Sequence, residues 1–129
     1  LCSSKAEILE KITERPFLLQ KFVDGSRGED VRIEVIGGRA VCAMRRRNAK
    51  DFRSNITNGG TAEAYAPTEE EAALAVKACK LLGLTFGGVD ILNNGEVCEV
   101  NSNAHIIIMR ATGIDLAPMI FEEIGKNIK

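Results

Sequence analysis

Two carboxylates and a carboxamide stand close together in one short stretch of the sequence. Asp90 and Glu99 flank Asn94-Gly95, a dipeptide that is typical of a tight turn between antiparallel strands. With that turn, Asp90 lies directly opposite Glu99, and Asn101 points to the same face of the sheet. Oxygen ligands of this kind suit Mg²⁺ or Mn²⁺, which completes its shell with water and substrate phosphates.

The facing carboxylates also have a simpler interpretation. Like charges directly opposite on a sheet repel each other, but a solvated strand face tolerates them when one carboxylate is protonated or screened. A bound cation would remove the repulsion instead. Asn101 and the small Gly87-Gly88, which permit close approach to Asp90, favour a metal site, and both interpretations stay open.

Basic side chains gather on the preceding hairpin and its loop. Arg32, Arg45-Arg46-Arg47, Lys50 and Arg53 fall within about twenty residues. A solvated positive face is the usual reason for such a run. The net charge of -1, with five phenylalanines and one tyrosine to stack bases, argues against a nucleic-acid surface. A more specific hypothesis is that these arginines hold a polyphosphate beside a metal ion.

The arginines are placed by a first predicted hairpin. Residues 30–36 alternate between polar and apolar, Gly37-Gly38 follows, and a second strand runs over 39–47. A Gly-Gly pair between two such runs predicts a two-residue turn. The expected register pairs Val31 with Met44, Ile33 with Cys42, Val35 with Ala40, Asp30 with Arg45 and Arg32 with Ala43. One face then packs on a core and the other presents arginines.

The remaining elements follow from capping signals and periodicity. We expect a helix from Ser4 that ends before Arg15-Pro16, a strand over 17–24, a polar loop over 48–60, a short strand over 62–65, a helix from Thr68 to Gly83, strands over 86–92 and 96–101, and a helix from about Asp115. Val89, Ile91, Cys98 and Val100 should face the core. Hairpins mixed with helices predict the α+β class, with an antiparallel sheet and packed helices.

Composition bounds the possibilities further. A length of 129 residues with 45% hydrophobic side chains fits one domain with a sizeable core. No apolar run approaches the roughly 20 residues that a membrane span needs. Four cysteines without a CxxC pair suit buried thiols in a reducing compartment, so we expect a cytoplasmic protein. The sequence says nothing about the oligomeric state.

Several motifs combine into a specific pattern. They are Arg45-Arg46-Arg47, Asp51-Phe52-Arg53-Ser54-Asn55, Gly59-Gly60, Gly88-Val89-Asp90 and Glu99-Val100-Asn101. In this order they resemble the ATP-grasp superfamily, and within it the RimK-like carboxylate–amine ligases, which include ribosomal-protein glutamate ligases. The resemblance covers almost the whole chain.

The resemblance implies an ATP-dependent ligase that joins a carboxylate to an amine through an acyl-phosphate, for instance adding glutamate to an acceptor. It implies that Asp90, Glu99 and Asn101 bind two Mg²⁺ ions, with Mn²⁺ as an alternative, that bridge the phosphates of ATP. Arg53, with Asn55 as its companion, would act near the γ-phosphate. The expected ATP contacts are Gln20, Lys21, Phe22, Val23, Asp30, Arg32 and Arg45, although the family commonly has Glu where Lys21 stands.

The chain departs from the family pattern after Asn101. The family often continues with a small residue and Pro-Gly, whereas Ser102-Asn103-Ala104-His105 follows here. That turn borders the acceptor site, so the identity of the substrate stays open. His105 could contact a substrate, although a packed or solvated histidine is the commoner case. The apolar run 106–109 is interpreted as a surface left uncovered by truncation.

Counterparts of the family's front domain and Gly-rich loop are missing from these residues. The resemblance therefore implies that 1–129 is the C-terminal part of an ATP-grasp domain, with the N-terminal part of the same protein, ATP and an amino-acid or peptide substrate as partners. One part of an ATP-grasp domain cannot by itself exclude water from ATP or position both substrates, so we expect this part to be inactive alone. Two alternatives remain, a non-catalytic nucleotide- or phosphate-binding module of the same fold and a structural α+β domain.

Overall fold

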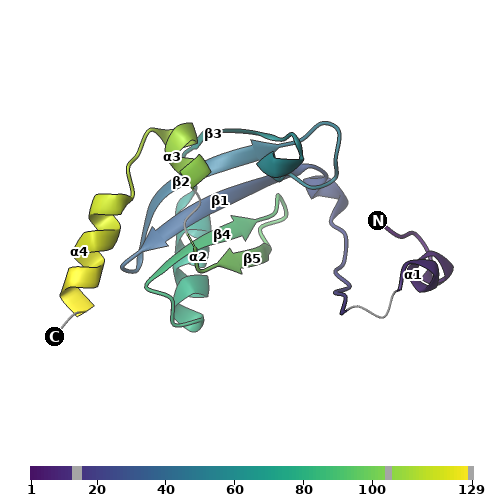
Figure 1. Ribbon diagram of the computed structural model, residues 1–129, viewed down its shortest axis with the longest axis horizontal. Coiled ribbons are helices and arrows are strands. Elements are labelled where there is room, and N and C mark those ends of the chain that lie inside the picture. Colours follow the sequence, from purple (N-terminus) through teal and green to yellow (C-terminus); the bar gives the residue numbers. More distant parts are fainter. Residues whose placement is uncertain (13–15, 104–105, 128–129) are drawn as a thin grey trace.

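The computed structural model describes residues 1–12, 16–103 and 106–127. Within these ranges the strands form a five-stranded antiparallel sheet in the order β3-β2-β1-β4-β5 (Figure 1). The elements are α1 (Lys5–Lys11), η1 (Asp24–Ser26), β1 (Glu29–Ile36), β2 (Arg39–Arg47), η2 (Ile56–Asn58), β3 (Thr61–Tyr65), α2 (Glu69–Leu81), β4 (Phe86–Ile91), β5 (Val97–Asn101), α3 (Ile106–Thr112) and α4 (Ala117–Asn127). The α+β class with packed helices is confirmed.

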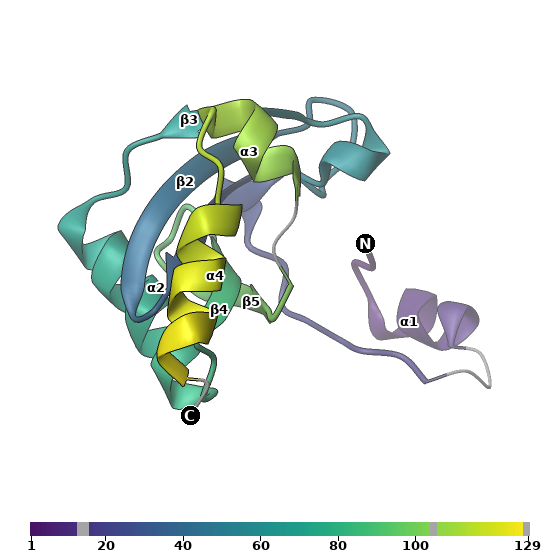
Figure 2. The same cartoon turned by 60° about the vertical axis from the view of Figure 1, so that its left-hand side comes forward.

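Helices cover both faces of the sheet. On one face, Ala75 and Cys79 of α2 pack on a core that includes Ile33 and Val89. On the other, Ile108 of α3 joins a second cluster with Ile36, Met44 and Leu116. Figure 2 shows α3 and α4 on the side of the sheet opposite α2. The part of this second face that the cluster leaves open carries the charged side chains described below.

Helix α2 begins where its capping box predicts. Thr68 Oγ1 accepts a hydrogen bond from the Glu71 backbone N–H, and the Glu71 carboxylate accepts one from the Thr68 N–H. Ala75 and Cys79, one turn apart, are buried against the sheet. Leu82, at the end of the helix, is 61% exposed.

The first hairpin forms as predicted, but its register is only partly right. Val35 pairs with Ala40, and then a bulge shifts the pairing so that Arg32 lies opposite Met44 and Asp30 opposite Arg46. A shift of one residue sends every later side chain of β2 to the other face of the sheet. The predicted pairing of Asp30 with Arg45 is therefore wrong.

Three further expectations are corrected. Residues 17–23 form no strand, and Phe17, Leu18 and Leu19 are exposed on a segment that leads to α1, apart from the body (Figure 2). The run 106–109 starts helix α3, in which Ile108 is fully buried, so it is not an uncovered surface. Cys98 is exposed because β5 pairs Ile91 with Val97 and skips it. His105 lies outside the described residues.

The other predicted elements are confirmed with small changes at their ends. The short strand β3, the hairpin of β4 and β5, and α4 lie where the sequence placed them. All four cysteines are free, but Cys2 and Cys98 are exposed, so burial of all four was a wrong expectation. None of the helices in the described ranges has the length and apolarity to cross a membrane.

Candidate functional site

Four charged side chains meet on the open part of the second sheet face. Arg32 holds Asp90 in a two-pronged contact, with 2.6 Å from Nε to Oδ1 and 2.8 Å from Nη2 to Oδ2. Arg46 holds Asp30 in the same way, at 2.7 and 2.6 Å. Arg46 Nη2 also lies 2.8 Å from Asp90 Oδ2. The four side chains form one buried network of two positive and two negative charges, which we call the arginine–aspartate cluster.

The cluster keeps both guanidinium groups charged. Burial lowers the pKa of Arg32, but its hydrogen bonds to Asp90 and the charge of that carboxylate outweigh burial, so the pKa is raised. The pKa of Arg46 is also raised, because its bonds to Asp30 and Asp90 outweigh its burial. Bidentate, charge-assisted contacts of this kind fix the direction of each side chain. The four charged side chains of the cluster therefore have fixed orientations on this face of the sheet.

The sequence missed Arg46 and identified Arg45 in its place. Arg45 lies on the face that carries α2, with its Cζ 4.3 Å from the centre of the Tyr65 ring. Its Nε is 3.6 Å from Glu29 Oε1. Arg45 lines neither of the two cavities described next, whereas Arg46 lines one of them. The bulge in the hairpin is the physical reason why Arg46, and not Arg45, lies on the face of the site.

A cavity of about 230 Å³ lies over the cluster. It brings together Arg32, Arg46, Glu99, Asn101 and Asn55. The predicted pairing of Asp90 with Glu99 is confirmed, and Asn101 lies opposite Gly88 on the same face. The structure thus places the three predicted metal ligands on neighbouring positions of β4 and β5.

These three residues fit a hard cation in their chemistry. Glu99 is an exposed carboxylate. The Asn101 Nδ2 atom is buried but has no hydrogen-bond partner among the described residues, so no hydrogen bond from this atom fixes the orientation of the carboxamide. Both oxygens of Asp90 already accept from guanidinium groups, although a carboxylate offers about four lone-pair positions. Within the described residues no three His, Cys, Asp or Glu side chains form a metal group, so the carboxamide and outside oxygens would have to complete the shell.

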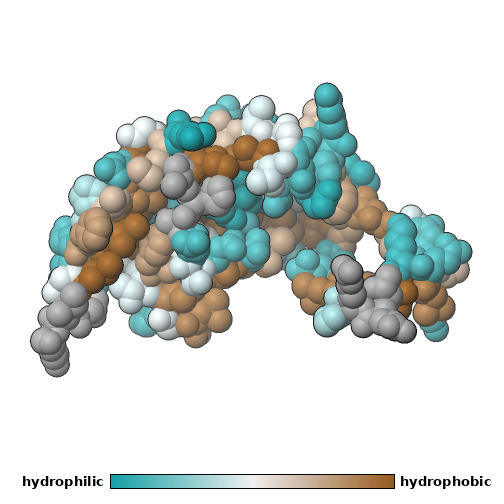
Figure 3. All heavy atoms as spheres, viewed as in Figure 1, coloured by the Kyte–Doolittle hydropathy of each residue, from teal (hydrophilic) through white to brown (hydrophobic). Residues whose placement is uncertain are grey.

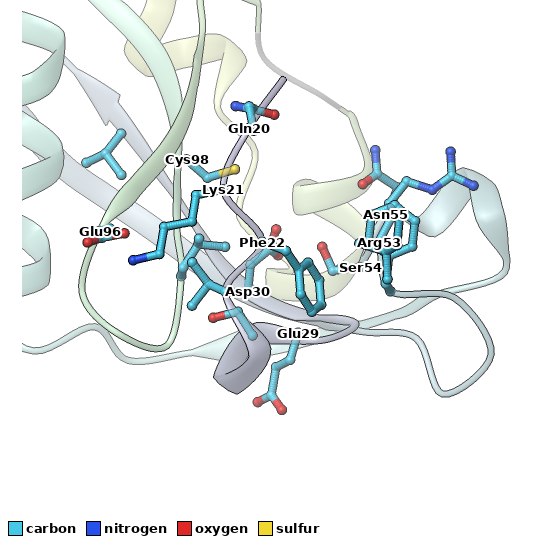
Figure 4. Close-up of a pocket in the computed structure, with 16 residues that line it drawn as sticks. Gln20, Lys21, Phe22, Glu29, Asp30, Arg53, Ser54, Asn55, Glu96 and Cys98 are labelled. Carbon is cyan, nitrogen blue, oxygen red and sulfur yellow. The ribbon is translucent and has the colours of Figure 1, made fainter. Parts of the chain in front are cut away.

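A larger cavity of about 600 Å³ adjoins the first one, and Asn55 lines both. Its walls include the predicted nucleotide contacts Gln20, Lys21, Phe22, Val23 and Asp30, together with Arg53. Figure 4 shows Glu96 and Cys98 on one side of the Gln20–Phe22 segment and Ser54, Asn55 and Arg53 on the other. In Figure 3 the molecule is hollowed between its body and the N-terminal segment.

The loop that carries Arg53 and Asn55 is held at its base. Buried Asn48 accepts from the N–H groups of Lys50 and Asp51 and donates to the Asn58 carbonyl. Gly28 donates to the Phe52 carbonyl, and its φ of 66° and closeness to Asn48 leave no room for a side chain. Within the described residues, the Arg53 guanidinium is hydrogen-bonded to Asp51 of its own loop and lies over the Phe52 ring, and the side chain is 53% exposed.

Glu34 is a buried carboxyl group that the sequence did not single out. It is 0% exposed, and neither of its oxygens has a hydrogen-bond partner among the described residues. Burial, opposed by the charge of Arg32, raises its pKa from 4.5 to about 7. Glu34 lies two residues after Arg32 in β1 and therefore on the same face, opposite Cys42 and Gly88.

The fold and the paired cavities define an ATP-grasp domain. The structure is similar to that of the ATP-grasp ligase PsnB complexed with a phosphomimetic variant of its minimal precursor, Mg and ADP, with a TM-score of 0.58 and 28% identity over 78% of this chain and 33% of that one. The family model of the RimK-like ATP-grasp domain matches residues 2–124. The chain therefore belongs to the RimK-like ATP-grasp family, as the resemblance predicted.

Curated relatives agree with this family. Two probable alpha-L-glutamate ligases, from Vibrio atlanticus and Halorhodospira halophila, are 44% and 48% identical over 117 and 118 residues. The matches cover 87% and 88% of this chain, but 39% of each relative. The chain thus spans about two-fifths of the length of these relatives.

Proposed function

We propose that this chain is the metal- and phosphate-binding part of an ATP-dependent carboxylate–amine ligase that acts through an acyl-phosphate. The observation that carries the proposal is the pair of cavities joined at Asn55. One has arginines together with Glu99 and Asn101, and the other has the Gln20–Val23 segment and Arg53. Such an arrangement suits a nucleotide whose phosphates point toward cations.

The larger cavity would hold the nucleoside. Phe22 and Phe52 meet edge to face, with 6.0 Å between ring centres, and offer apolar surface for a base. Gln20 and Lys21 offer backbone and side-chain polar groups beside them (Figure 4). The phosphates would extend past Asn55 toward the smaller cavity.

The smaller cavity would hold the phosphates and their metal ions. Asp90, Glu99 and Asn101 would be the ligands of two Mg²⁺ ions, or of Mn²⁺, which neutralise charge on the phosphate oxygens when bound. Arg32 and Arg46 keep their positive charge and fix the Asp90 carboxylate. The PsnB complex contains Mg and ADP, which supports this choice for the present chain.

Arg53 and Asn55 would act on the transferred phosphoryl group. The substrate carboxylate attacks the γ-phosphorus, ADP leaves, and an acyl-phosphate forms. The amine then attacks the acyl carbon, phosphate leaves, and the nitrogen loses a proton. Arg53 is exposed, and its contacts with described residues lie within its own loop, so its guanidinium can exchange Asp51 for a phosphate oxygen at a small cost in free energy.

The substrates follow from the relatives. Their names point to L-glutamate as the amino acid added, and we extend this to the protein that contains the present chain. The remaining three-fifths of such a protein would supply the other wall of the nucleotide site. We propose that the 129-residue chain alone does not turn over ATP, and that the enzyme works in the cytoplasm, where Mg²⁺ and ATP are abundant and thiols stay reduced.

The test uses a protein of the relatives' full length that contains this chain. With ATP, Mg²⁺ and a peptide acceptor, we expect ADP release that depends on L-glutamate. An ¹⁸O-labelled acceptor carboxylate should transfer one labelled oxygen to the released phosphate. Glutamate-independent ADP release, or phosphate without label, would contradict the proposal. Turnover of ATP by the isolated chain would contradict its predicted inactivity.

A further inference from the structure

One row of residues crosses three strands beside the proposed metal site. Glu34 of β1 lies opposite Gly88 of β4, and Gly88 lies opposite Asn101 of β5. Residues directly opposite on neighbouring strands project to the same face. Glu34 and Asn101 therefore flank Gly88 on the face that carries the arginine–aspartate cluster.

Gly88 leaves the space between these two side chains open. A Cβ placed on Gly88 would lie 3.0 Å from Glu34 Oε1 and 3.1 Å from Oε2, so the carboxyl group extends over the glycine. Neighbouring strands are about 4.8 Å apart and β5 is two strands from β1, so the carboxyl group has crossed about half of the distance to β5. What remains is within the reach of an asparagine side chain.

Each of the two side chains also has an unused hydrogen-bonding group. Among the described residues, Glu34 Oε1, Glu34 Oε2 and Asn101 Nδ2 are buried and have no partner. The first two are acceptors and the third is a donor. Buried polar groups without partners cost free energy, and native structures nearly always pair them. An acceptor and a donor left over on the two sides of one glycine complement each other.

We infer that Glu34 is a positioning residue for Asn101. The two groups are not bonded to each other in the structure; after a rotation of the Asn101 side chain, the Glu34 carboxyl group accepts a hydrogen bond from Asn101 Nδ2, and this contact turns Asn101 Oδ1 toward the metal ion. The inference rests on the proposed function, because it assigns Asn101 as a ligand. Groups that orient metal ligands commonly change metal affinity by ten- to a hundredfold. The three heavy atoms nearest to a Cβ placed on Gly88 all belong to the Glu34 carboxyl group.

Two substitutions of Glu34 separate this role from a general structural one. Glu34→Gln keeps an acceptor oxygen of the same reach, whereas Glu34→Leu fills the space without one. Ile33→Val, on the same strand but facing α2, is the matched control for disturbance of the core. Circular dichroism and thermal unfolding establish that all three variants fold.

The measurement is an Mg²⁺ titration of the chain in the presence of ADP, followed by NMR of the Asn101 side-chain N–H₂ group. We expect Mg²⁺ to shift these signals and slow their exchange with water in the wild type, in Glu34→Gln and in Ile33→Val. In Glu34→Leu the protection should be lost and the apparent Mg²⁺ affinity should fall about tenfold. Equal protection and affinity in Glu34→Leu would overturn the inference.

Failure of the proposed metal site would give a different result. The wild-type signals would then not respond to Mg²⁺ at all. Exchange of the Asn101 N–H₂ group in the metal-free wild type and in Glu34→Leu would still decide whether the contact exists. Slower exchange in the wild type supports it, and identical exchange refutes it.

Discussion

Arg32 and Asp90 face each other across β1 and β4 as a buried ion pair with two short contacts, 2.6 and 2.8 Å long. Asp90 also accepts from Arg46, so its charge is compensated before any ligand binds. An Mg²⁺ ion at this carboxylate has to share it with the guanidinium groups or displace one of them. Glu99 and Asn101, which are not committed in this way, are the more accessible part of the proposed site.

The first prediction concerns the stability that this pair provides. Arg32→Met should lower the free energy of unfolding of the chain by about 3 kcal/mol, because it leaves a buried carboxylate with one guanidinium instead of two. Chemical denaturation at neutral pH measures the change.

Arg47→Met is the matched control. Arg47 lies on β2 and pairs with Glu29 and Glu63, but its side chain is 49% exposed, and exposed pairs contribute less than about 1 kcal/mol. Equal losses in the two variants would show that the buried contacts around Asp90 do not stabilise the fold.

The second prediction concerns the pH dependence caused by Glu34. Because its pKa rises from 4.5 to about 7 on folding, the folded state binds more protons between these values. Its contribution to stability is therefore complete below pH 4.5 and is lost as the pH rises through 7. Arg32, Asp90 and Arg46 are the charged groups that face it.

Glu34→Gln removes this titration. Relative to the wild type, the variant should gain about 3 kcal/mol between pH 4.5 and pH 8, while the two differ little at the acid end. Denaturation curves across this range measure the difference, and other titrating groups cancel in the comparison. A difference that stays constant with pH would contradict the raised pKa.

The third prediction concerns Arg53. In the longer protein, Arg53→Ala should lower kcat about a hundredfold, as loss of a donor to the transferred group commonly does. Its side chain is exposed and, within the described residues, contacts Asp51 and the Phe52 ring of its own loop, so the free energy of unfolding of the chain should change little. Steady-state kinetics and denaturation measure the two effects.

Lys50→Ala is the control for this loop. Lys50 is exposed in the same loop but lines neither cavity. It should leave kcat nearly unchanged. If Lys50→Ala were as slow as Arg53→Ala, the loss would reflect loop geometry and not the guanidinium group.

Much of the site could be predicted from local sequence. Asn94-Gly95 is a tight-turn signal, so the pairing of Asp90 with Glu99 followed from counting residues and was confirmed. The capping box at Thr68 placed α2 for the same reason, since its hydrogen bonds are local. The family was also recognised, because its motifs occur in order along the chain.

The errors arose where distant contacts decide the structure. In β2, Val41 and Cys42 are both partly buried and apolar, so alternation gave no sign of the bulge that exchanges Arg45 for Arg46. Helix α3 begins with three isoleucines, which suit a strand equally well, so the sequence pattern did not predict a helix there. Glu34 shares the face of Arg32 in the predicted register too, but its complete burial depends on contacts with neighbouring strands and helices that alternation does not reveal.

The central claim is that Glu99, with Asp90 and Asn101, binds the metal that carries the nucleotide. Calorimetric titration of ADP into the chain, with Mg²⁺ and with a chelator, tests it most directly. Glu99→Gln removes a carboxylate of β5, and Glu63→Gln, as a control, removes an exposed carboxylate of β3 that lines neither cavity. We predict Mg²⁺-dependent ADP binding in the wild type and in Glu63→Gln that weakens at least tenfold in Glu99→Gln. ADP binding that is equally tight with Mg²⁺ and with a chelator, or equally tight in Glu99→Gln and in the wild type, would contradict the account.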